Sequence, residues 1–103
     1  MPREILKMHG EYKTPGGKLV IVDFEVDGGA LAEVRITGDF FLYPEDALDD
    51  IVRAVEGLPA GSSPQEIAHA VESAVAPDVA LVGFSPGAIA TAIERGLTNV
   101  SAS

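Results

Sequence analysis

The chain of 103 residues contains no cysteine, and His9 and His69 are its only histidines. The lack of cysteine excludes a disulfide framework, a thiol nucleophile and any zinc or iron–sulfur site held by cysteine ligands. Basic residues are also scarce, because seven Lys and Arg oppose 16 Asp and Glu, giving a net charge of −9. This deficit disfavours partners such as nucleic acid or an anionic membrane surface.

Long apolar runs are absent as well. The longest, Val79 to Phe84, is far too short to span a bilayer. The charged N-terminal residues are not followed by an apolar segment, so no signal peptide is predicted. We therefore expect a cytoplasmic protein of one domain, over residues 1–97, because the length and the 47% share of hydrophobic residues are ordinary for a folded domain.

The few basic residues are unevenly placed. Residues 1–38 hold six acids and five bases, a net charge of −1, whereas residues 39–103 hold ten acids and two bases, a net charge of −8. A surface that attracts anions would therefore come from the first third of the chain. Its candidate residues are Lys7, Lys13, Lys18 and Arg35.

Two turn signals divide the first 38 residues into three predicted strands. Pro15-Gly16-Gly17 and Asp27-Gly28-Gly29 supply residues suited to tight turns. Around them, apolar and polar residues alternate with the period of a half-buried strand. The side chains expected on the buried face are those of Leu6, Met8, Tyr12, Val20, Val22, Phe24, Val26, Ala32, Val34 and Ile36. The pattern predicts a three-stranded antiparallel sheet.

Three helices are predicted after the strands, from capping residues and from apolar positions that recur with helical spacing. The expected boundaries are Pro44 and Gly57 for the first, the capping box Ser63-Pro64-Gln65-Glu66 and Pro77 for the second, and Ser85-Pro86 and Gly96 for the third. The fold class is therefore α+β, with the sheet covered on one face by about three helices. Residues 79–82 form either a brief strand or a buried connector, and residues 98–103 are expected to be a disordered tail.

One motif is typical of a catalytic serine. Gly83-Phe84-Ser85-Pro86-Gly87 matches the G-x-S-x-G turn of hydrolases, but those enzymes place a histidine after the serine. Both histidines of this chain precede Ser85. We therefore interpret Ser85 as the N-cap of the third helix, with no catalytic role.

Two further patterns are weak as chemistry. Gly16-Gly17-Lys18 lacks the residues of a phosphate loop, because Tyr12 and Leu19 stand where that motif needs a glycine and a hydroxyl residue. Its exposed N–H groups, beside Lys13 and Lys18, could still meet an anion or a partner's acid. The acidic residues of the first helix are expected to be hydrated, so no metal site is predicted.

An aromatic run follows the third strand. Phe40, Phe41 and Tyr43 cannot all enter one small core, because successive side chains of an extended chain point to opposite sides. Either at least one of them is offered to a partner, where aromatic residues contribute strongly, or all three fold over the end of the sheet.

These segments together resemble the C-terminal accessory domain of lipoate–protein ligases. The likeness rests on Thr14-Pro15-Gly16-Gly17-Lys18, the Val26-Asp27-Gly28-Gly29 hairpin, the run from Val34 to Phe41, and the helix ending Glu56-Gly57. With the closing helix, it covers about residues 13–97. In some prokaryotes this domain is a separate small protein, and a chain that begins at Met1 and ends after one domain matches that arrangement.

The resemblance implies a non-catalytic subunit, needed by a catalytic lipoate–protein ligase subunit for forming lipoyl-adenylate and dispensable for transfer from preformed adenylate. ATP, Mg and lipoate are expected in that partner, and lipoyl-carrier proteins are indirect partners. From the residues, we expect a docking edge and a secondary contact. The edge is Gly38, Asp39, Phe40, Phe41 and Tyr43, and the secondary contact is Lys13, Gly16, Gly17 and Lys18.

The order of elements also resembles iron–sulfur cluster assembly scaffolds. Those proteins hold their cluster or persulfide on cysteines, which this chain lacks. Only the fold can therefore be shared. The alternative function is a protein-binding regulatory module of that fold, without cluster chemistry.

Overall fold

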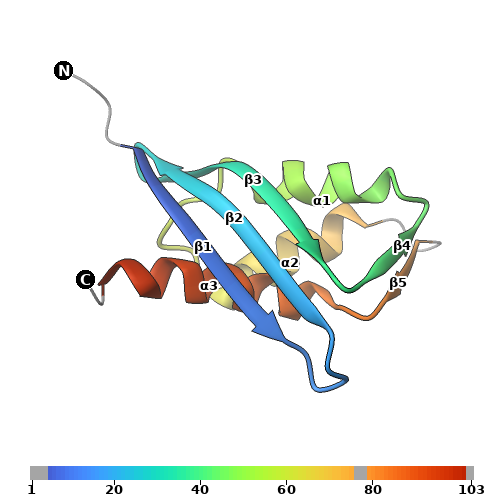
Figure 1. Ribbon diagram of the computed structural model, residues 1–103. Helices are drawn as coiled ribbons and strands as arrows, with labels where there is room; N and C mark the ends of the chain where they lie inside the picture. The colour runs from blue at the N-terminus through green and yellow to red at the C-terminus, as the bar shows by residue number, and fades with distance from the viewer. Residues whose placement is uncertain (1–4, 76–78, 102–103) are drawn as a thin grey trace.

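The computed structural model describes residues 5–75 and 79–101 of the chain. Its main sheet has three antiparallel strands, β1 (Ile5–Lys13), β2 (Leu19–Asp27) and β3 (Ala30–Gly38), in the order β1-β2-β3 (Figure 1). Both predicted hairpins are present, and the alternation in β2 is regular, with every second side chain buried. The predicted three-stranded antiparallel sheet is confirmed, but Leu6, which was expected on its buried face, is 37% exposed.

The register of β3 contains an irregularity that the sequence did not predict. Asp23 pairs with Arg35 and Glu25 pairs with Ala32, so that two residues, Glu33 and Val34, stand opposite one on β2. Such a β-bulge reverses the faces that side chains occupy beyond it. The prediction that Ala32 lies on the buried face is therefore wrong, and Leu31 is buried in its place.

Three helices lie in the described part of the chain: α1 (Ala47–Val55), α2 (Pro64–Ala74) and α3 (Pro86–Ser101). The capping box of α2 is confirmed, with the Glu66 N–H donating to Ser63 Oγ at 3.1 Å and the Ser63 N–H donating to Glu66 Oε1 at 2.9 Å. The predicted end of α2 at Pro77 lies outside the described residues.

Two predicted helix boundaries are wrong. Helix α1 has Asp46 as its N-cap, and Pro44 lies before the helix, where its carbonyl accepts from the Ala47 N–H at 3.0 Å. Helix α3 does not end at Gly96 but continues to Ser101, so the tail expected over residues 98–103 begins inside it. Gly96 packs against the main sheet, which explains a glycine within the helix.

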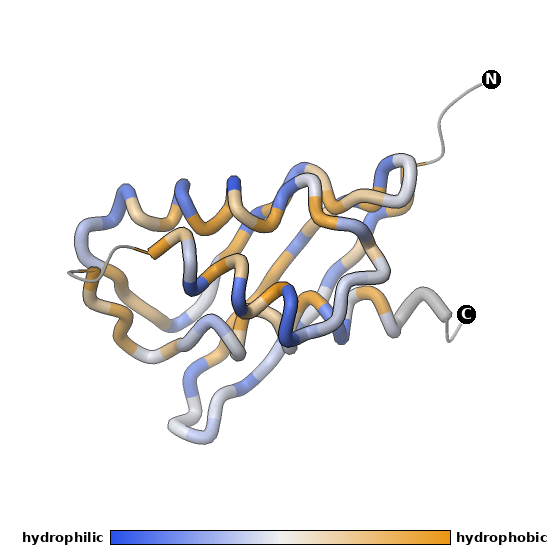
Figure 2. The backbone as a smooth tube through the Cα atoms, turned by 180° about the vertical axis from the view of Figure 1, so that it is seen from behind, coloured by the Kyte–Doolittle hydropathy of each residue, from blue (hydrophilic) through white to orange (hydrophobic). Residues whose placement is uncertain are grey.

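The helices cover one face of the main sheet (Figure 1). Helix α3 packs against β1 and β2, α2 packs against α3, and α1 lies between α2 and β3. The core between these layers includes the fully buried side chains of Leu31, Ile51, Ile67, Ile89, Ile93, Val20, Val22, Val55 and Val71. In Figure 2 the polar segments of α1 lie on its outer side, and its apolar segments face the rest of the molecule. The α+β fold class is confirmed.

A second, smaller sheet lies at one end of the molecule. Its strands are β4 (Phe41–Tyr43) and β5 (Ala80–Val82), which pair antiparallel, so the open question about residues 79–82 is answered by a strand. The start of β1 and the last turn of α3 lie at the opposite end (Figure 1). None of the helices in the described part of the chain has the length and apolar content needed to cross a bilayer.

Candidate functional site

The aromatic run forms strand β4, and its side chains alternate between outside and inside. Leu42 is buried in the core, whereas the side chains on either side of it are exposed, Phe41 by 66% and Tyr43 by 61%. The cause is the period of two along an extended strand. The alternative in which all three aromatic residues cover the end of the main sheet is therefore wrong.

Strand β5 extends this exposed surface. Val82 is paired with Phe41 and Ala80 with Tyr43, and residues directly opposite in an antiparallel pair share one face. Val82 is 52% exposed. We call this surface, made by Phe41, Tyr43, Ala80 and Val82, the β4–β5 face. Sequence reasoning missed Val82, because the pairing of residues 80–82 with the aromatic run could not be seen in the sequence.

Phe40 has a different place. Its ring contacts the ring of Phe84, with centroids 4.4 Å apart and planes inclined by 42°, and it is half-buried against the core. Tilted aromatic pairs of this kind contribute about 0.5–1.5 kcal/mol beyond their buried area. Phe40 therefore anchors the second sheet. Of the three aromatic residues of the run, Phe41 and Tyr43 are the ones exposed enough to contact a partner.

Gly38 and Asp39 direct the chain from β3 into β4. Gly38 has φ of 144°, and a Cβ atom there would lie 2.1 Å from the carbonyl oxygen of Leu19. The Asp39 N–H donates to the same oxygen at 2.9 Å. These two residues of the predicted docking edge thus have a structural role, and their contact with a partner stays a prediction.

The hairpin predicted as a secondary contact forms hydrogen bonds among its own residues. The Gly17 N–H donates to the Thr14 carbonyl at 2.8 Å, and the Lys18 N–H donates to Thr14 Oγ1 at 3.1 Å. The N–H groups of Gly17 and Lys18 are therefore engaged within the hairpin and are not open to an anion. The Lys13 and Lys18 side chains are exposed, and a role for them and for Gly16 and Gly17 in binding a partner stays a prediction.

Lys18 lines a groove of about 750 Å³ between this hairpin and the start of α3. Ser85 also lines the groove, and its Oγ accepts from the Ala88 N–H at 3.2 Å. This is the geometry of an N-cap, as the sequence predicted. Among the described residues that line the groove there is no histidine to activate a serine.

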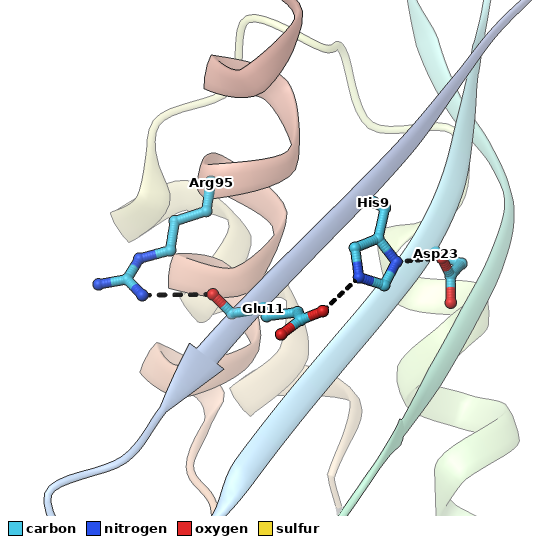
Figure 3. A network of polar contacts seen from close by, with 4 residues as sticks. All are labelled: His9, Glu11, Asp23 and Arg95. Atoms are coloured by element: carbon cyan, nitrogen blue, oxygen red, sulfur yellow. Dashed lines mark hydrogen bonds and ion pairs between the residues drawn. The ribbon is translucent and has the colours of Figure 1, made fainter.

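The outer face of the main sheet carries a polar cluster around His9 (Figure 3). His9 Nε2 lies 2.6 Å from Glu11 Oε2, and His9 Nδ1 lies 2.5 Å from Asp23 Oδ1. These two hydrogen bonds raise the pKa of His9 above its ordinary value of 6.5, and the bond to Glu11 has the larger effect. Asp23 is the cross-strand partner of His9, and Glu11 is two residues along the same face. The spacing could have predicted this cluster.

Arg95 of α3 lies beside this cluster. Its guanidinium donates to the main-chain carbonyl of Glu11 at 3.3 Å and stands 5.0 Å from the centre of the Tyr12 ring. It thus occupies a carbonyl of the edge strand β1. Within residues 5–75 and 79–101, no group of three His, Asp or Glu side chains has the arrangement of a metal site.

Comparison with known proteins gives one curated relative and one solved structure. The chain is 35% identical over 49 residues to lipoate-protein ligase A subunit 2 of Thermoplasma acidophilum. That match spans 48% of this chain and 48% of the relative, about half the length of each. No protein-family model matches the sequence.

The solved structure is that of an archaeal lipoylation system from the same organism, described as a bi-partite lipoate protein ligase and its E2 lipoyl domain. One of its chains superposes on this chain with a TM-score of 0.64 and 21% sequence identity, over 89% of this chain and 97% of that one. The two chains share a fold over most of their length. The resemblance to lipoate–protein ligases that the residues indicated is confirmed by the curated relative. The solved structure shows that the shared fold extends over most of the chain.

Proposed function

We propose that this chain is the non-catalytic accessory subunit of a two-piece lipoate–protein ligase. A separate catalytic subunit would need it for the ATP-dependent step that forms lipoyl-adenylate. The observation that supports the proposal most is the shared fold, over nearly the whole chain, with one chain of a bi-partite ligase. The segment that is 35% identical to a ligase subunit 2 from the organism of that structure agrees with it.

The roles of this chain's own groups agree with an accessory part. Ser85, the residue that most resembles a nucleophile, uses its hydroxyl to cap α3. The glycine–lysine hairpin, which most resembles a phosphate loop, uses the Gly17 and Lys18 amides within its own turn. In the proposed complex, ATP, Mg and lipoate would be bound by the catalytic subunit, and transfer to a lipoyl-carrier protein would occur there.

An accessory subunit can promote adenylation by contact alone. In that reaction the lipoate carboxylate attacks the α-phosphorus of ATP and pyrophosphate leaves, giving a mixed anhydride that water can hydrolyse. A subunit docked beside this site orders the surrounding loops and excludes water. The transfer step needs only the finished adenylate and the lysine amine of the carrier, so it would depend less on the accessory subunit.

Reconstitution tests this proposal. The catalytic chain of the two-piece ligase is taken from the organism that encodes this chain. It is supplied with ATP, Mg and lipoate, with and without this chain, and pyrophosphate release is measured. We expect release only when both chains are present. In a second assay, with preformed lipoyl-adenylate and a lipoyl domain, we expect transfer without this chain. Equal pyrophosphate release in its absence would refute the proposal.

A protein-binding regulatory module is the second candidate, because the exposed β4–β5 face fits any protein partner. This alternative predicts that the chain does not alter pyrophosphate release by the catalytic chain. The same assay therefore separates the two functions.

A further inference from the structure

We infer that the β4–β5 face is the surface through which this chain binds the catalytic subunit, and that the subunit meets it with an apolar patch bordered by basic residues. This inference rests on the proposed function and adds to it the location and the chemistry of the contact. It also narrows the predicted docking edge to Phe41 and Tyr43 and adds Val82 to them.

The apolar character of the face is the first argument. An antiparallel sheet with one face on the core normally presents polar side chains to water on the other. The second sheet is apolar on both faces, because Leu42 and Leu81 pack against the core while Phe41, Tyr43 and Val82 point outward. These three are the most exposed large hydrophobic side chains in the described part of the chain. Aromatic residues in such positions are typical centres of protein interfaces.

The small size of the second sheet is the second argument. Each strand has three residues, and an isolated pair of strands is marginally stable in water. Packing of Leu42 and Leu81 against the core supports the sheet from one side only. A partner that covers the outer face would support it from the other side. Burial of this apolar face against a partner therefore contributes more favourable free energy than burial of a polar surface would.

The charge on the α1 side of the face indicates the chemistry of its partner there, whereas on the other side Lys18 lines a groove together with Val82. The chain that leaves β4 carries the exposed acids Glu45 and Asp46 and then Asp49 and Asp50 of α1, and it contains no basic residue before Arg53. Glu45 lines a depression of about 340 Å³ together with Phe41 and Tyr43. Opposite charges at the border of an interface speed association and fix orientation. A complementary partner therefore has Lys or Arg beside its apolar patch, on the side that meets Glu45 and Asp46.

The opposite end of the molecule offers a matched control. Ile5 and Leu6, at the start of β1, are 46% and 37% exposed and are likewise apolar. The start of β1 lies at the end of the molecule away from β4 and β5 (Figure 1). If any exposed hydrophobic pair served equally well for binding, this pair would serve too.

The test compares the double variants Phe41→Ser/Tyr43→Ser and Ile5→Ser/Leu6→Ser with the wild-type chain. Calorimetric titration gives the Kd for the catalytic subunit, and thermal unfolding checks that each variant is folded. Because central aromatic residues dominate interface energetics, we expect the first variant to raise the Kd by about 100-fold or more. We expect the control to change it by less than about threefold, and Glu45→Lys to raise it about fivefold, with less effect at high salt.

Each outcome has a separate meaning. If the wild-type chain does not bind the catalytic subunit, the proposed function fails. If the wild-type chain binds and stimulates adenylation but Phe41→Ser/Tyr43→Ser binds equally well, only the assignment of the surface is overturned. If the chain alone forms a dimer that this variant dissociates, the face is a self-contact and the inference is wrong.

A second measurement covers the case in which the double variant does not fold. A photo-crosslinking amino acid replaces Phe41 in one preparation and Ile5 in another, each mixed with the catalytic subunit. We expect a crosslinked heterodimer from position 41 and none from position 5. Equal crosslinking, or crosslinking from position 5 alone, would overturn the inference.

Discussion

Gly10 of β1 and Gly96 of α3 lie directly against each other, so that the backbone of the helix touches the backbone of the strand. A Cβ atom on Gly10 would lie 1.8 Å from the carbonyl oxygen of Ala92 and 2.7 Å from the Gly96 nitrogen. A Cβ atom on Gly96 would lie 3.2 Å from the Gly10 nitrogen and 2.8 Å from the ring of Phe24. Glycine at both positions therefore sets the distance between the main sheet and α3.

Gly10→Ala tests this contact. Backbone atoms cannot move aside as a flexible side chain can, so we expect the free energy of unfolding to fall by about 1–3 kcal/mol or more. Denaturant unfolding measures the change. Gly61→Ala is the control, because a Cβ atom there has no neighbour within 4 Å, and its effect should stay within about 0.5 kcal/mol. Equal stability of the two variants would show that the close approach does not constrain the fold.

Glu56 supports the bulge in β3. Its Oε2 accepts from the Val34 N–H at 3.0 Å, next to Glu33, whose φ is 48°. Glu56→Ala leaves that partly buried donor without its acceptor, so we expect a loss of about 1–2 kcal/mol in the free energy of unfolding. Glu72→Ala, on the exposed side of α2, is the control and should change it by less than about 0.5 kcal/mol. Slower hydrogen exchange of the Val34 amide in wild type than in Glu56→Ala would support the same contact.

The His9 cluster predicts a pH dependence of stability. Hydrogen bonds to Glu11 and Asp23 raise the pKa of His9 in the folded state above 6.5, its ordinary value. Its contribution is therefore fully present below pH 6.5 and is lost as the pH rises through the raised pKa. In His9→Gln, the stability should not show this fall. The measurement is the free energy of unfolding of both proteins from about pH 6 to about pH 9. Parallel curves would contradict the prediction.

The regular elements could be predicted from the sequence because their signals are local. Alternation in residues 19–27 and the letters of the Ser63–Glu66 capping box each specify one conformation of the backbone. The bulge could not be predicted, because Glu33 and not glycine occupies its left-handed position. The end of α3 was misplaced because glycine both ends helices and permits close packing, and the letter Gly96 does not distinguish the two.

The candidate site was predicted in part for the same physical reason. The run at 40–43 alone indicates that three nearby aromatic residues cannot all enter one core, because successive side chains of a strand point to opposite sides. It leaves open whether any of them is offered to a partner. The pairing partner β5 has three residues, too few to show a period, and it lies far along the chain from β4. Val82 and the inward position of Phe40 depend on that pairing and on contact with Phe84, so only the folded chain reveals them.

Ser85 gives the last prediction, because its hydroxyl can be assigned either to structure or to chemistry. As the N-cap of α3 it accepts from the Ala88 N–H, and removal of such a cap costs about 1 kcal/mol. We expect Ser85→Ala to lower the free energy of unfolding by that amount, as Ser63→Ala should at the start of α2. In the reconstituted ligase we expect the rate of pyrophosphate release to stay within about twofold of wild type under conditions in which both variants are folded. A variant as stable as wild type but with adenylation abolished would give Ser85 a chemical role and contradict its assignment as a cap.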